Sequence, residues 1–182
     1  MKKRPCPAGA RTVLLVEGGD EERLCSALLP PRALVWFVVV GRTSLAETLG
    51  LRKDAAWPQI RNVGVVMDAE EDVPASLALA RSCFSMLGRA VPSEAGEVLR
   101  GDAGNDGLFL LPDNVAVGAA ETLLRRTALP EITRCIDGLF ACTPNPGTTV
   151  ARRDKAWVNA WLSAARGEGR VDRVAEHGRA GD

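Results

Sequence analysis

Short apolar runs alternate with amphipathic stretches along most of the chain. Four apolar runs of strand length are predicted to be β-strands: residues 12–16, 33–40, 63–68 and 107–111. Six amphipathic stretches bounded by turn residues are predicted to be helices: one opening at residues 17–22 and ending near residue 29, then 44–51, 74–87, 118–127, 130–139 and 153–166. Strands that alternate with helices are typical of parallel sheets, so we predict an α/β fold with a mostly parallel sheet of about four strands flanked by helices.

Three parts of the chain depart from this pattern. Residues 1–10 are predicted to be a flexible N-terminal segment, and residues 167–182, which carry the sole histidine, His177, a disordered tail. Residues 88–107 are rich in glycine and polar side chains and are predicted to be a loop with at most one short strand. The intervening residues 11–166 are long enough for one well-cored domain.

The last predicted helix carries an apolar stripe. Trp157, Val158, Trp161 and Leu162 repeat at helical spacing, which indicates a packing face. We therefore expect both tryptophans to lie in the core rather than to form a platform on which bases stack.

Composition narrows the class of protein. The 23 basic and 23 acidic residues balance, so the protein has no net positive charge that would attract nucleic acid. Binding of nucleic acid would therefore need a local basic patch or a metal ion. Five cysteines at irregular spacing favour reduced thiols and a cytoplasmic protein. The longest apolar run, residues 33–40, is far too short to span a membrane, and a soluble protein is expected. Phosphate-loop and G-x-S-x-G motifs are absent.

Carboxylates follow the ends of three predicted strands. Glu17 follows the first strand, Asp68 and Glu70 end the third, and Asp113 follows the fourth. Because the carboxyl ends of parallel strands share one edge of a sheet, these side chains are expected to meet there. Clustered acids repel by roughly 4 kcal/mol per pair about 4 Å apart at an effective dielectric of 20, so they need separation, protonation or a cation. An all-oxygen set favours Mg²⁺ or Mn²⁺ over zinc.

Neighbouring acids have a structural explanation. Asp72 is predicted to cap the helix that contains Pro74, and Glu71 beside it favours the helix dipole. The same explanation applies to Glu22 in the first helix. This structural explanation accounts poorly for Asp68 with Glu70, and for Glu17, because Asp68 and Glu17 lie at strand ends before the helices. A functional role is favoured for these three residues.

Four motifs resemble those of Toprim domains, in particular the small stand-alone proteins related to the OLD-family nucleases. The motifs are Val16-Glu17-Gly18-Gly19-Asp20-Glu21, the D-x-D-like Asp68-Ala69-Glu70, the segment Gly107 to Glu121, and Asp154-Lys155-Ala156 opening the last helix. Glu70 departs from the second aspartate of that pattern but is still an oxygen ligand. The resemblance covers roughly residues 11–165 and implies a Toprim-like, Rossmann-like fold.

The resemblance also implies site residues for phosphodiester chemistry. Glu17 would be a metal ligand or general base, Asp68 and Glu70 metal ligands, Glu121 a ligand of a second metal, and Lys155 a stabiliser of transition-state charge. Four further acids are additional candidates: Asp20, Glu21, Asp72 and Asp113.

The resemblance leaves a choice of function. The chain has no tyrosine, so it cannot form the phosphotyrosine link of a topoisomerase, and it lacks the zinc-binding and additional domains of a primase. A Mg²⁺-dependent nuclease acting on DNA or RNA, in phage defence or nucleic-acid processing, is the favoured hypothesis. The alternative is a non-catalytic Toprim module that binds nucleic acid or a partner ATPase. A receiver-like protein phosphorylated on Asp68 is a third hypothesis. The oligomeric state stays open, with a homodimer as one option.

Overall fold

The computed structural model describes residues 5–42, 46–142 and 149–165. The chain divides into two compact units, residues 1–120 and 121–182, which are described in turn. The expectation of one domain over residues 11–166 stays a prediction. The predicted tail, with His177, lies outside the described residues.

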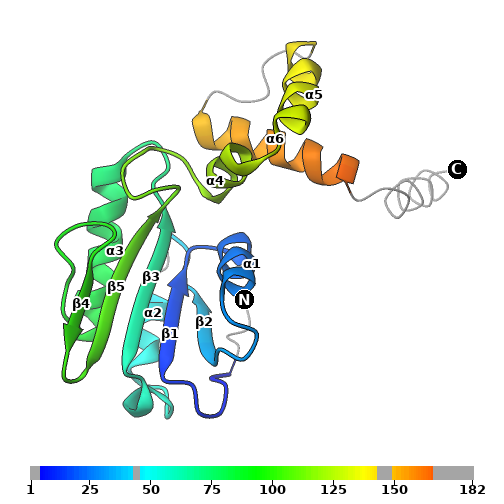
Figure 1. Cartoon of the computed structure of the whole chain (residues 1–182). Coiled ribbons are helices and arrows are strands. Elements are labelled where there is room, and N and C mark those ends of the chain that lie inside the picture. The colour runs from blue at the N-terminus through cyan, green and yellow to red at the C-terminus, as the bar shows by residue number, and fades with distance from the viewer. Residues whose placement is uncertain (1–4, 43–45, 143–148, 166–182) are drawn as a thin grey trace, which may run out of the picture. The chain divides into compact units, whose positions relative to one another are not determined.

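The first unit is built on a five-stranded sheet (Figure 1). Its strands are β1 (Thr12–Val16), β2 (Val35–Val39), β3 (Asn62–Asp68), β4 (Val98–Gly101) and β5 (Gly104–Leu111). The strand order is β2-β1-β3-β5-β4, and every pair is parallel except the β4–β5 hairpin. The predicted α/β class and mostly parallel sheet are therefore confirmed.

The short strand that the sequence allowed within residues 88–107 is β4. It is an edge strand with mainly exposed side chains, so it lacks the apolar run that marks a buried strand. Its hairpin with β5 also moves the start of β5 back to Gly104 from the predicted residue 107.

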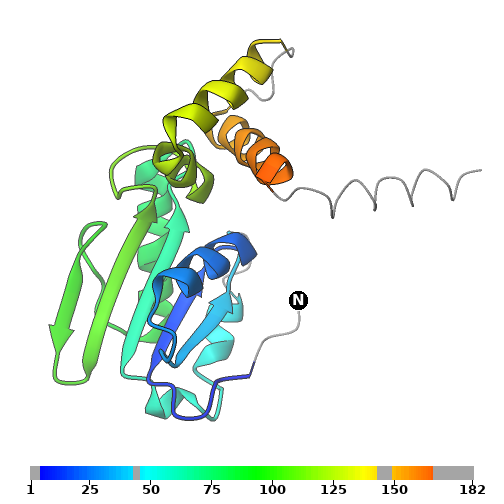
Figure 2. The ribbon, with the colours of Figure 1, turned by 45° about the vertical axis from the view of Figure 1, so that its right-hand side comes forward.

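Helices cover the two faces of the sheet unequally. The helical segments of this unit are α1 (Gly19–Leu28), α2 (Ala46–Leu51), the 3₁₀ turn η1 (Trp57–Gln59) and α3 (Val73–Leu87). Figure 2 shows α1 against β1 and β2 on one face and α2 and α3 on the other. The core lies between the central strands β1 and β3 and the helix α3. The strands contribute the buried side chains of Val13, Leu15, Val63, Val65 and Met67, and α3 contributes Ala80, Phe84 and Leu87.

Sequence signals fix both ends of α3. The Asp72 carboxylate accepts a hydrogen bond of 2.9 Å from the Ala75 backbone N–H, which confirms Asp72 as the N-cap. Gly88 ends the helix in the left-handed conformation, with φ of 64°. This capping places the first turn of α3 directly after the acidic end of β3.

The second unit contains α4 (Ala120–Thr127, whose first residue belongs to the first unit), α5 (Pro130–Ala141) and α6 (Val150–Ala165). Trp157 is fully buried beside Ile136 and Val158, and its indole N–H donates to the Asp137 carboxylate at 2.9 Å. Trp161 packs edge-on against Trp157, with ring centroids 6.0 Å apart. The packing role predicted for the two tryptophans is confirmed.

The start of α6 corrects the sequence prediction. The helix begins at Val150 rather than at Arg153, because the Thr149 hydroxyl accepts a hydrogen bond from the Arg152 backbone N–H. Lys155 therefore lies in the second turn and not in the first.

The five cysteines are free thiols, as predicted from their spacing. No described helix combines the length and apolar character that crossing a bilayer requires.

We predict that Trp157→Ala lowers the free energy of unfolding by about 3–5 kcal/mol, because it empties a fully buried aromatic site. Trp161→Ala, at a half-buried position, is expected to cost less. Urea denaturation of both variants measures the difference. Equal, small losses would contradict the assignment of Trp157 as the centre of this core.

Candidate metal centre

The candidate site lies where the direction of the chain reverses across the sheet. From β1 the chain crosses to β2 on one side. From β3 it crosses to the opposite side, reaching the edge strand β4 first and returning through the hairpin to β5, which pairs with β3. The carboxyl ends of β1 and β3 therefore border the topological switch point, which is where open α/β sheets bind ligands. Glu17 directly follows β1, and Asp68 is the last residue of β3.

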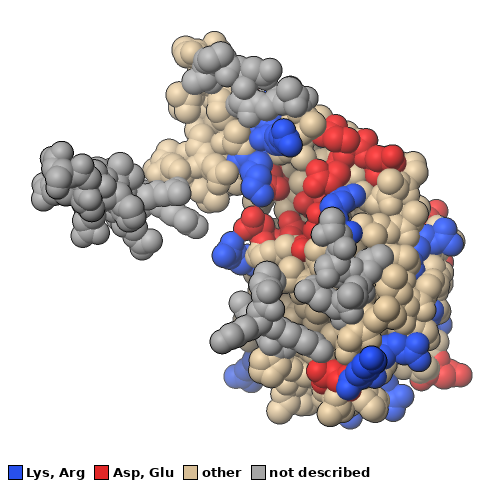
Figure 3. All heavy atoms as spheres, turned by 180° about the vertical axis from the view of Figure 1, so that it is seen from behind, with Lys and Arg blue, Asp and Glu red and all other residues tan. Residues whose placement is uncertain are grey.

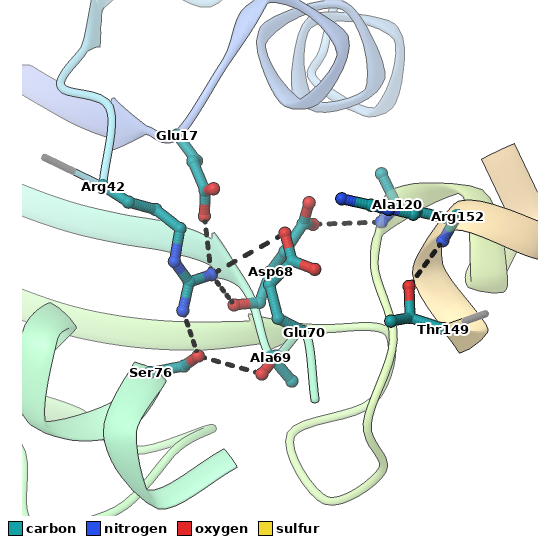
Figure 4. Close-up of polar contacts among 9 residues, drawn as sticks. All are labelled: Glu17, Arg42, Asp68, Ala69, Glu70, Ser76, Ala120, Thr149 and Arg152. Carbon is teal, nitrogen blue, oxygen red and sulfur yellow. Dashed lines mark hydrogen bonds and ion pairs between the residues drawn. The ribbon is translucent and has the colours of Figure 1, made fainter. Parts of the chain in front are cut away.

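Three carboxylates converge at this switch point (Figure 4). One oxygen from each of Glu17, Asp68 and Glu70 lies within 4.8 Å of the others. Asp68 is buried at 8% exposure, whereas Glu17 and Glu70 are half-buried. Three oxygen donors at this spacing, partly open to solvent, could hold a divalent metal ion.

Asp68 is fixed by the chain that leads into α4. Its carboxylate oxygen Oδ1 accepts a hydrogen bond of 3.0 Å from the Ala120 backbone N–H. Two backbone hydrogen bonds of 2.7 Å each join Glu70 to Gly118 on the same stretch. Gly118 and Ala120, the first residue of α4, thus hold the end of β3 in place.

Glu70 has an unusual backbone conformation. Its φ of 54° lies in the left-handed region, which costs a non-glycine residue about 1–2 kcal/mol. The paired hydrogen bonds to Gly118 stabilise this conformation, which carries the Glu70 carboxylate to Glu17 and Asp68. Backbone strain that is maintained by surrounding contacts is typical of functional sites.

Arg42 was not identified from the sequence. Arg42 lies just after β2. Its Nη1 is 3.3 Å from a Glu17 carboxylate oxygen and 4.0 Å from a Glu70 carboxylate oxygen. The same nitrogen donates a hydrogen bond of 3.1 Å to the Asp68 backbone carbonyl. Its Nη2 donates to the hydroxyl of Ser76 on α3 at 2.7 Å. The available signal was a basic residue just after the strand that neighbours β1, at the same edge as the acids.

Burial raises the pKa of the Glu17 carboxyl above its ordinary value of 4.5, because the charged form is desolvated. Arg42 opposes this rise in pKa, and the negative charges of Glu70 and Glu21 add to it. Glu21, in the first turn of α1, is buried at 5% exposure. A Cβ atom at position 18 would lie 2.9 Å from a Glu21 oxygen, so Gly18 makes room for this fourth carboxylate.

Three of the additional candidates have local partners. Asp20 forms an exposed ion pair with Arg23 at 2.7 Å, and Asp72 caps α3. Asp113 accepts hydrogen bonds from the backbone N–H groups of Val115 and Ala116 in its own turn. These contacts give each of the three a structural role.

The remaining predicted residues belong to the second unit. Lys155 Nζ lies 3.4 Å from a Glu121 carboxylate oxygen. The Glu121 side chain is 11% exposed and the Lys155 side chain 61% exposed. The structure therefore brings together Glu17, Asp68 and Glu70 in one unit, and Glu121 with Lys155 in the other.

Charge on the surface is mixed. Figure 3 shows acidic and basic side chains interspersed over one face of the molecule, with several acidic side chains gathered together. This view agrees with the balanced charge of the whole chain.

Fold and site together define an α/β protein with an acidic cluster at the switch point of a mostly parallel sheet. The sequence matches the family described as "Protein of unknown function (DUF3226)" over residues 11–179, and the chain belongs to this family. Comparisons with curated proteins and with solved structures returned no match.

We predict that Glu17→Gln stabilises the metal-free protein at neutral pH. Because the pKa of Glu17 is raised in the folded state, this group contributes stability at low pH that is lost as the pH rises through the folded-state pKa. The free energy of unfolding of Glu17→Gln relative to wild type should therefore increase between about pH 4 and about pH 7. Chemical denaturation in the presence of a chelator measures it. A relative stability that stays constant or falls over this range would contradict the burial penalty.

Proposed function

We propose that this protein is a Toprim-type, Mg²⁺-dependent nuclease that hydrolyses phosphodiester bonds. The observation that carries the proposal is the convergence of Glu17, Asp68 and Glu70 at the switch point of the sheet. The resemblance of the Glu17-Gly18 and Asp68-Ala69-Glu70 motifs to those of Toprim domains supports the same conclusion.

In this proposal the three carboxylates bind and orient a divalent ion. When bound, such an ion lowers the pKa of a coordinated water and offsets the charge that develops on a phosphoryl group. Asp68, the most buried of the three, would be the most firmly positioned ligand, because the Ala120 backbone N–H donates to one of its oxygens. Glu17 would either ligate the ion or, as the general base, accept a proton from the attacking water.

The roles proposed for Glu121 and Lys155 rest on the sequence resemblance. Glu121 would ligate a second ion, and Lys155 would stabilise negative charge in the transition state. Their ion pair of 3.4 Å supplies each with a partner in the absence of substrate.

The substrate class is nucleic acid, DNA or RNA, and the proposed compartment is the cytoplasm. With equal numbers of acidic and basic residues, binding would depend on the ion and a few local cations rather than on a general basic surface. A role in phage defence or nucleic-acid processing, with or without a partner ATPase, is part of the proposal.

We predict that Asp68→Asn abolishes Mg²⁺-dependent cleavage of labelled DNA and RNA. The substitution removes a ligand charge but keeps an oxygen that can accept the Ala120 N–H, so the free energy of unfolding without metal should change by no more than about 1 kcal/mol. Asp102→Asn, at an exposed position in the β4–β5 turn, is the matched control and should cleave normally.

Two outcomes would contradict the proposal. Unchanged cleavage by Asp68→Asn would exclude the carboxylate cluster as the active site. Metal-dependent binding of nucleic acid by the wild type with no turnover would instead favour the non-catalytic module.

We also predict that Lys155→Ala lowers the cleavage rate about 100-fold or more, which is the typical effect of removing one preorganised charge-stabilising group. Stability should change little, since an ion pair with a lysine that is 61% exposed contributes little. Lys53→Ala, at another exposed lysine, is the control. Equal rates for the two variants would make Lys155 a solvated surface residue.

A further inference from the structure

Arg42 is a cation that the protein itself supplies to the carboxylate cluster. Its guanidinium contacts Glu17, lies 4.0 Å from Glu70 and donates to the backbone carbonyl of Asp68. One positive charge against three carboxylates leaves an excess of negative charge, so the cluster can still attract a divalent ion. That ion, however, must bind beside a like charge.

The guanidinium is anchored on the side of α3. Its Nη2 donates to the Ser76 hydroxyl, and this fully buried hydroxyl donates in turn to the Ala69 carbonyl at 2.9 Å. The Arg42 side chain is 30% exposed. These contacts hold the cation next to the cluster, where it cannot move freely into solvent to avoid a bound ion.

An anionic phosphate would reverse the effect of this arrangement. A guanidinium presents planar N–H groups that match two phosphate oxygens, and a phosphate placed between Arg42 and the ion would attract both. The repulsion between the two cations would then be offset by the substrate. Ion and substrate would each bind more tightly when the other is present, because coupling between two sites is reciprocal.

We propose that Arg42 is a positioning residue that couples divalent-cation binding to phosphodiester binding. It weakens the binding of the ion in the absence of substrate and contacts a phosphate when both are bound. This inference rests on the metal site of the proposed function, but it concerns binding and not hydrolysis.

The test is a Mn²⁺ titration, by calorimetry or electron paramagnetic resonance, with and without a short phosphorothioate oligonucleotide. This probe keeps the negative charge of a phosphodiester and resists cleavage. For the wild type, the probe is expected to tighten Mn²⁺ binding by about tenfold or more. A methylphosphonate oligonucleotide of the same length, which is uncharged, should have no such effect.

The decisive variant is Arg42→Gln. Without the probe it is expected to bind Mn²⁺ about tenfold more tightly than the wild type, and the further gain on adding the probe should fall below about threefold. Arg81→Gln, at an exposed position on α3, is the matched control and should retain both wild-type values. Arg42→Lys keeps the charge but not the planar fork, so its Mn²⁺ affinity without the probe should stay weak while the coupling decreases. If Arg42→Gln does not fold, Arg42→Lys decides the question.

The proposal is overturned if Arg42→Gln shows the same Mn²⁺ affinity and the same coupling as the wild type, or if wild type and variant both fail to bind Mn²⁺. Unreduced coupling in Arg42→Lys also overturns it. Cleavage is measured separately. A wild type that couples Mn²⁺ to the probe but hydrolyses neither DNA nor RNA would refute the nuclease function and leave the role of Arg42 intact.

Discussion

The main constraint on this structure is the repulsion among the carboxylates that the sheet brings together, because the surrounding residues must offset its cost. Glu17 and Asp68 lie at the ends of adjacent parallel strands, and the left-handed backbone of Glu70 adds a third charge within 4.8 Å. Burial makes this arrangement costly, as the raised pKa of Glu17 shows. A protein that needed only a stable sheet would gain by placing neutral residues at these three positions.

The surrounding residues maintain the cluster against this cost. Hydrogen bonds from Ala120 and Gly118 hold the end of β3, and Asp72 fixes the start of α3. Arg42 offsets part of the negative charge and links the cluster to Ser76. The same few residues are thus held by backbone hydrogen bonds, by the cap of α3 and by an opposite charge. Support of this kind is what keeps the side chains of a preorganised site in place.

What the sequence could predict follows from the range of the interactions. The strands β1 and β3 were predictable because buried parallel strands are continuous apolar runs, and Glu17 and Asp68 follow from the shared edge of a parallel sheet. The edge strand β4 has no such run. The start of α6 depends on a single hydroxyl, that of Thr149. The contacts of Arg42 depend on where the chain turns after β2, and no local sequence pattern predicts the position of that turn.

The most direct measurement of the central claim is the anomalous scattering of a crystal soaked in Mn²⁺. The account predicts one strong peak at the switch point, within about 2.5 Å of a carboxylate oxygen from each of Glu17, Asp68 and Glu70. A soaked crystal with no peak at this position, and with Arg42 still bound to Glu17, would contradict it. The cluster would then be an ion-pair network in which Arg42 is the cation that offsets part of the negative charge.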